Sequence, residues 1–130
     1  MPEDHLKNKE LKLLLKIPVK ILAEQELTLN EKYILGLDYA LLEKLGYNNY
    51  TNKAVQDILH IHRNLISRAR IQLIKKGFLS KEKRVYRLTP LALYYCDQDD
   101  PMVYIPQWVY TMDNLTTGGK LLYAEYNAMC

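Results

Sequence analysis

The chain has 130 residues, 48% of them hydrophobic and 25% charged, with a net charge of +3. This length indicates one domain with room for the start of another, and the apolar content is sufficient to bury a core. The composition excludes several classes. No apolar run approaches the ~18 residues of a membrane span, and the polar start MPEDH is unlike a signal peptide. Two cysteines cannot form a disulfide framework, so we expect a soluble, cytoplasmic protein that contacts no membrane.

The N-terminal part predicts a short apolar entry followed by a long core helix. Residues 1–10 are charged and expected to be a flexible N-terminus, and 11–16 form a strand or a first helical turn. Pro18 suits the first position of a short helix that ends near Gln25. The stretch 28–31 (TLNE) has the form of a capping box, which starts a helix over 29–45 that Gly46 ends. Apolar residues recur along this helix at helical spacing and predict a buried face: Ile34, Leu35, Leu37, Leu41, Leu42 and Leu45.

Two further helices follow, separated by a tight turn. Thr51 is the predicted cap of a helix over 52–59, and residues 60–62 form the turn, with Ile61 pointing inward. The next helix covers 63–76 and is ended by Gly77. On a helical wheel its inner face carries four apolar residues: Leu65, Ile66, Ala69 and Leu73.

The opposite face of the 63–76 helix is polar and basic. It carries Asn64, Ser67, Arg68, Ile71 and Lys75, and Arg63 and Arg70 flank it at one border. Amide, hydroxyl, cationic and aliphatic groups are the types that contact base edges and phosphates in a major groove. The distribution of charge supports the same interpretation, because residues 60–87 hold nine of the 18 Lys and Arg and Glu82 is the one acidic residue among them. A local charge of +8 on such a helix pair is typical of a nucleic-acid-binding surface.

The remaining elements are shorter. Residues 78–88 predict a β-hairpin with a charged tip, and Thr89-Pro90 begins a helix that reaches Cys96. The acidic stretch after it indicates a linker over 97–104, so we assign one domain to 11–96. Residues 105–130 repeat the N-terminal segment at an offset of 88, with Ile17-Pro18 matching Ile105-Pro106. This partial repeat is either the start of a second similar module or a helix that packs on the first domain or a second subunit.

The region from Leu14 to Thr89 resembles a winged helix-turn-helix domain, mainly α-helical with a small β-hairpin. The residues that carry the resemblance are KIPVKILAEQELTLNEKYILGLDYALL at 16–42 and HIHRNLISRARIQLIKKGFL at 60–79. More narrowly, it resembles the domains of replication initiators and replisome organisers of bacterial plasmids and phages. His60 stands where this family usually has a small residue or glycine.

The resemblance implies binding to double-stranded DNA in plasmid or phage replication initiation. His62, Arg63, Asn64, Ser67 and Arg68 would approach the major groove, and Lys81, Lys83 and Arg84 would reach the backbone or minor groove. From their charge and position, Lys53, Lys75, Lys81, Lys83 and Arg84 are candidates to neutralise phosphates, and Ile71 completes the interface. Two alternatives remain open: a transcriptional repressor on the same fold, and a protein-interaction or dimerisation module. A homodimer and contacts with replication proteins are also compatible with the sequence.

Other chemistries are less well supported by the sequence. His60 and His62 have no Cys or carboxylate at a spacing suited to zinc, and we interpret them as turn residues or a phosphate contact. The segment 117–120 (TGGK) lacks the first glycine and the Ser or Thr of a phosphate-binding loop. The two serines lie in no arrangement with histidine and an acid that would make a nucleophile. We therefore predict no catalytic residues, no metal and no cofactor.

Overall fold

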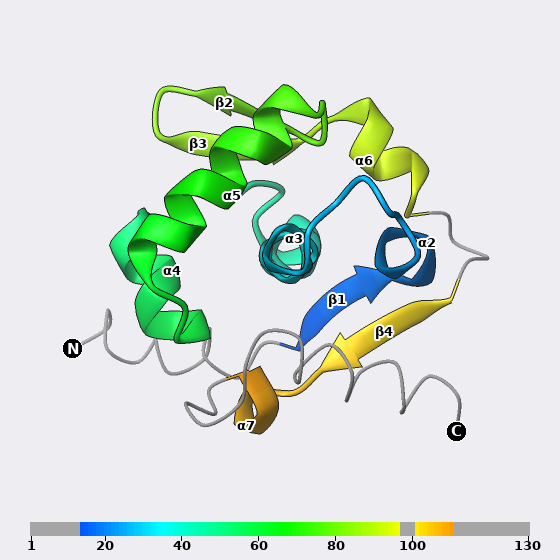
Figure 1. The fold of residues 1–130 in the computed structure, drawn as a ribbon, viewed down its shortest axis with the longest axis horizontal. Coiled ribbons are helices and arrows are strands. Elements are labelled where there is room, and N and C mark those ends of the chain that lie inside the picture. Colours follow the sequence, from blue (N-terminus) through cyan, green and yellow to red (C-terminus); the bar gives the residue numbers. More distant parts are fainter. Residues whose placement is uncertain (1–13, 97–100, 111–130) are drawn as a thin grey trace.

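The computed structural model describes residues 14–96 and 101–110, and shows a mainly helical fold with two small antiparallel sheets (Figure 1). The elements in chain order are β1 (Leu15–Pro18), α2 (Val19–Leu22), α3 (Leu29–Lys44), α4 (Asn52–Leu59), α5 (Arg63–Lys75), β2 (Leu79–Glu82), β3 (Val85–Leu88), α6 (Pro90–Tyr94), β4 (Met102–Ile105) and α7 (Gln107–Tyr110). Among the residues described, none of the helices is long and apolar enough to cross a membrane. The element order confirms the prediction of a mainly helical chain with a small β-hairpin.

Helix α3 is the centre of the fold. Figure 1 views it end-on, with α4 and α5 on one side and the β1–β4 pair on the other. Every residue from Glu31 to Leu41 is buried, so the helix is enclosed on all sides, although the sequence indicated only one buried face. At its predicted end the helix is less enclosed, and Leu45 is 41% exposed. Gly36 lets β1 approach closely, because a Cβ atom there would lie 3.0 Å from Ile17 Cγ1.

The predicted start of α3 is confirmed in detail. The Thr28 hydroxyl accepts a hydrogen bond from the Glu31 N–H at 3.2 Å, and the Glu31 carboxylate accepts one from the Thr28 N–H at 3.1 Å. This reciprocal pair satisfies two N–H groups that a helix start leaves without partners. The short helix before α3 differs from the prediction. Pro18 is the last residue of β1 and directly precedes α2, so it is not the first residue of the helix, and α2 ends at Leu22 instead of near Gln25.

The pair α4 and α5 forms where the sequence predicted it. Thr51 caps α4 through a 3.1 Å bond from the Ala54 N–H, and Ile61 in the connecting turn is buried. His60 ends α4 with a φ of 58°, a left-handed conformation that glycine adopts most easily. Gly77, with a φ of 89°, follows α5 as expected.

The inner face of α5 differs from the prediction at one border. Ile66, Ala69 and Leu73 are buried, as expected, but Leu65 is 42% exposed. At the other border, Arg70 was expected to flank the outer face and is instead only 2% exposed. Leu65, predicted to be buried, is exposed, and Arg70, predicted to be exposed, is buried.

The hairpin and the helix that follows it are confirmed. Strands β2 and β3 pair antiparallel with Glu82 opposite Val85, so Lys83 and Arg84 form the tip. Lys83 has a φ of 60°, as tight two-residue hairpin loops require. The Thr89 hydroxyl accepts a hydrogen bond from the Ala92 N–H and caps α6, which begins at Pro90. Strand β3 also bridges to Asn48, which ties the hairpin to the loop before α4.

Strand β4 and helix α7 contribute to the same core as the earlier elements. Strand β4 pairs with β1 so that Lys16 lies opposite Tyr104, and Ile105, Val109 and Tyr110 are buried. Lys16 and Tyr104 are 88 residues apart, which is the offset of the predicted repeat. Helices α2 and α7 are related by the same offset. The β1–β4 register is therefore the one expected if the two copies of the strand–proline–helix unit are related by a two-fold axis. Half of the predicted linker, 97–100, and most of the repeat, 111–130, lie outside the described residues, as does the N-terminal segment 1–10. The division into domains therefore stays a prediction.

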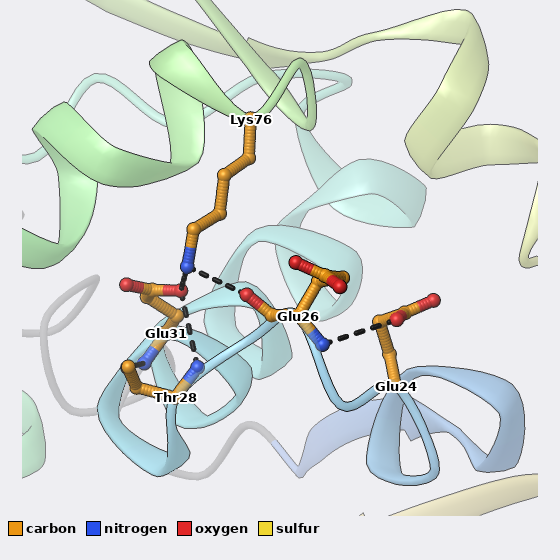
Figure 2. A network of polar contacts seen from close by, with 5 residues as sticks. All are labelled: Glu24, Glu26, Thr28, Glu31 and Lys76. Carbon is orange, nitrogen blue, oxygen red and sulfur yellow. Dashed lines mark hydrogen bonds and ion pairs between the residues drawn. The ribbon is translucent and has the colours of Figure 1, made fainter.

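Lys76, directly after α5, ties the end of that helix to the start of α3. Figure 2 shows its ammonium group between Glu31 and the backbone of Glu26, at 2.6 Å from Glu31 Oε1 and 2.7 Å from the Glu26 carbonyl oxygen. Glu31 is 3% exposed, so its carboxylate depends on this cation and on the Thr28 N–H. One of the basic residues that the sequence assigned to the charged window is thus half-buried and joins two segments of the fold.

We predict that Lys76→Met destabilises the protein by about 2 kcal/mol, because it leaves the Glu31 carboxylate buried without its cation. The neighbouring Lys75 is exposed, so Lys75→Met is the matched control and should change stability by less than about 0.5 kcal/mol. Urea unfolding followed by circular dichroism measures both variants. Equal stability of the two variants would show that the Lys76–Glu31 pair does not hold the helices together.

Candidate nucleic-acid interface

Seven of the nine cations in the 60–87 window are exposed. Lys76 is half-buried and pairs with Glu31, and Arg70 is buried. The exposed seven come from α5 and the hairpin: Arg63, Arg68, Lys75, Lys81, Lys83, Arg84 and Arg87. The basic surface predicted from the sequence is therefore present, although it is smaller by two charges.

The outer face of α5 is exposed along its length. Asn64, Arg68 and Lys75 are exposed, Ile71 is 49% exposed, and Ser67 is half-buried. These five side chains are the ones that the helical wheel placed outward. The structure brings polar, cationic and aliphatic groups onto one continuous helical surface, with Ser67 the least accessible of them.

The N-terminus of α5 is capped by side chains that the sequence did not identify as caps. His62 Nδ1 accepts a hydrogen bond from the Asn64 N–H at 3.1 Å, and Gln56 Oε1 accepts one from the Arg63 N–H at 2.8 Å. This geometry requires the Nδ1 atom of His62 to be unprotonated, so in the capped state only Nε2 can face a ligand. His62 thus has a structural role in addition to its predicted place at the interface. The side chains of Arg63 and Asn64 remain exposed.

The other candidate phosphate-binding residues differ in whether their side chains already contact another group. Lys53 forms an exposed ion pair with Asp57 at 3.1 Å, a spacing of four residues on α4. Such a pair contributes little stability, so the cation can exchange partners at small cost. Lys81 lies 5.3 Å from the centre of the Tyr86 ring, while Lys83 and Arg84 are exposed at the hairpin tip.

Arg70 is the largest departure from the predicted site. Its Nη1 atom donates hydrogen bonds to the Tyr50 carbonyl oxygen at 2.9 Å and to Asn52 Oδ1 at 2.8 Å, and its guanidinium lies 4.0 Å from the Tyr86 ring centre. Burial lowers the pKa of Arg70, and the negative charge of Asp38 opposes that effect. Arg70 therefore fastens α5 to the start of α4 and to the hairpin, and is not on the border of the outer face.

Asp38 of α3 is the buried acid behind this cation. Burial raises its pKa to about 6, against the opposing effects of a hydrogen bond from Asn48 and of the charge on Arg70. The Asn48 Nδ2 atom donates to Asp38 Oδ1 at 2.9 Å, and Asn48 Oδ1 accepts from the Tyr50 N–H at 2.9 Å. A polar network thus runs from the central helix through the loop at 48–50 to Arg70.

Sequence reasoning missed this network, although one signal was available. Arg70 lies four residues after Ile66 and three before Leu73, which is the spacing of the buried stripe. No comparable signal marked Asn48 or Gln56. Among the described residues, no group of three or more His, Cys, Asp and Glu side chains is placed to hold a metal ion.

Comparisons with known proteins identify no related protein. No protein-family model matches the chain, and no curated protein or solved structure matches it.

The buried Asp38 predicts an unusual pH dependence of stability. Its folded pKa of about 6 lies above the ordinary value of 3.8, so the folded protein retains a proton that the unfolded chain releases. This contribution is largest below pH 4 and is lost as the pH rises through 6, amounting to about 3 kcal/mol in total. Asp38→Asn should remove it. The exposed Asp57→Asn is the control and should keep the wild-type profile. Chemical denaturation between pH 4 and 7 tests this, and parallel profiles for wild type and Asp38→Asn would contradict it.

Proposed function

We propose that this protein is a non-enzymatic, sequence-specific double-stranded DNA-binding protein, and that α4, α5 and the β2–β3 hairpin act as a winged helix-turn-helix. One observation carries the proposal. The seven exposed cations of the 60–87 window occur on α5 and the hairpin, together with exposed groups that can contact bases. An exposed face that combines cations with amide, hydroxyl and aliphatic groups fits a major groove and the phosphates beside it.

The outer face of α5 supplies the base contacts. Arg68, near the middle of the helix, is suited to a bidentate contact with guanine, and Asn64 to one with adenine. Arg63 and Ser67 lie beside them, and Ile71 offers an apolar contact to a thymine methyl group. The exposure of Asn64, Arg68 and Ile71 supports this assignment, since each is accessible without rearrangement of the helix.

Phosphate contacts surround this face. Lys75 lies at the end of α5, Lys53 on α4, and Lys81, Lys83 and Arg84 on the hairpin. Each phosphate that a cation neutralises releases counterions, which makes binding depend on salt concentration. His62 joins this set through Nε2, the ring nitrogen that does not cap α5.

The biological process is replication initiation of a plasmid or phage in our proposal, and the protein acts in the cytoplasm. This part depends on the resemblance of residues 16–42 and 60–79 to the winged domains of replication initiators and replisome organisers. An origin with repeated binding sites fits this role, whereas a single site beside the protein's own promoter fits a repressor.

We predict that Arg68→Ala loses discrimination between the specific site and random duplex by about 1–3 kcal/mol, because a bidentate base contact exists only at the correct base pair. Lys44→Ala is the control, since Lys44 is an exposed cation at the end of α3, outside the proposed interface. Fluorescence anisotropy on both duplexes measures the ratio of affinities. An equal loss on both duplexes would make Arg68 a phosphate contact and contradict its role in base reading.

A further inference from the structure

A pocket of about 370 Å³ opens between the start of α4 and the β2–β3 hairpin. Its walls are residues 49–52, Arg70 of α5, and Lys81, Arg84 and Tyr86 of the hairpin. This volume is within the range of small-ligand pockets, roughly 300–1,000 Å³. Three of the lining side chains are cationic and none is acidic, so the pocket favours an anion.

The buried Arg70 adds a fixed positive charge to the wall of this pocket. Its Nη1 atom donates to Tyr50 and Asn52, which hold the guanidinium in place. A guanidinium can only donate hydrogen bonds and stays positively charged, so it favours an anion nearby.

The start of α4 faces the same pocket. Thr51 and Asn52 line it, and the Thr51 hydroxyl already accepts the Ala54 N–H. The N–H groups of Asn52 and Lys53 precede the first hydrogen bond inside the helix, which runs from Val55 to Thr51. The N–H groups of a helix's first turn and the positive end of the helix dipole together favour a phosphate.

The walls of the pocket are fixed to each other before any ligand arrives. Asn48 and Tyr86 exchange two backbone hydrogen bonds, of 2.9 Å and 2.8 Å, which join the loop before α4 to strand β3. Arg70 holds the same loop from the side of α5. A preformed site loses little conformational entropy on binding, which increases affinity.

We propose that this pocket is a phosphate-binding site, with Lys81, Arg84 and the start of α4 as donors and Arg70 as the buried positive charge of its wall. The phosphate is either one group of a DNA backbone, in which case the proposal depends on the function proposed above, or part of a free phosphorylated small molecule. Lys83 is excluded from the site. It lies between Lys81 and Arg84 in the hairpin and is exposed, but it does not line the pocket.

The first experiment uses the protein without DNA and inorganic phosphate as the probe. Two-dimensional 15N–1H NMR should show saturable shifts of the Asn52 and Lys53 amides in phosphate, relative to chloride at matched ionic strength. Lys81→Gln or Arg84→Gln should each weaken this binding by about tenfold, the effect of one charge-assisted hydrogen bond. Lys44→Gln is the control, because Lys44 is an exposed cation at the end of α3 outside both the pocket and the proposed interface, and it should bind phosphate as the wild type does. All three variants are at exposed positions, so folding is not at risk.

The second experiment identifies the source of the phosphate. Duplexes that carry one neutral methylphosphonate at successive positions are titrated with wild type, Arg84→Gln and Lys44→Gln. If a backbone phosphate occupies the pocket, neutralising that phosphate should weaken binding of the wild type and of Lys44→Gln about tenfold and should leave binding of Arg84→Gln almost unchanged.

The outcomes separate the two proposals. Phosphate shifts together with coupling to Arg84 support the pocket and a DNA source. Phosphate shifts without DNA coupling, or in a protein that binds no duplex, support the pocket with a free phosphorylated ligand and count against the DNA source. Coupling without detectable inorganic phosphate binding also supports the pocket. The absence of both effects, or equal effects of Lys44→Gln and Arg84→Gln, overturns the proposal.

Discussion

The buried guanidinium of Arg70 is the contact on which the arrangement of the basic surface depends. It hydrogen-bonds the backbone of Tyr50 and the side chain of Asn52, and it stacks on Tyr86 of the hairpin. Through these contacts a single side chain of α5 fixes the start of α4 and the hairpin relative to the proposed recognition face. Asp38 lies behind it, and their attraction offsets part of the cost of burying a charge.

The basic residues of the 60–87 window fall into two groups with different physical roles. The buried Arg70 and the half-buried Lys76 hydrogen-bond to carbonyl, amide or carboxylate oxygens and join neighbouring helices. The other seven are exposed on α5 and the hairpin, where they create a positive potential. The two paired cations therefore help to set the geometry of the surface, and the seven exposed cations give it its charge. A sequence count of charge cannot separate the two groups, because it does not register burial.

The elements were predictable from the sequence where local interactions decide them. The bounds of α4 follow from the Thr51 cap, and those of the hairpin from Gly77 and the charged tip, all of which are signals within a few residues. Long-range contacts decided the features that the sequence did not reveal. Leu65 and Arg70 occupy equivalent borders of the helical wheel, and only the presence of Tyr86 and the loop before α4 beside Arg70 determines which one is buried. Likewise, one side of α3 is covered by β1, whose partner strand β4 comes from the far end of the described chain.

The most direct test of the central claim, specific binding of duplex DNA, is a fluorescence-anisotropy titration of the intact chain at several salt concentrations. It compares random duplex with duplex from the neighbourhood of the protein's own gene. Our account predicts tighter binding to the native duplex and a log–log salt slope of about −4 to −6, as expected when most of the seven exposed cations neutralise phosphates. No binding to either duplex at low salt would contradict it.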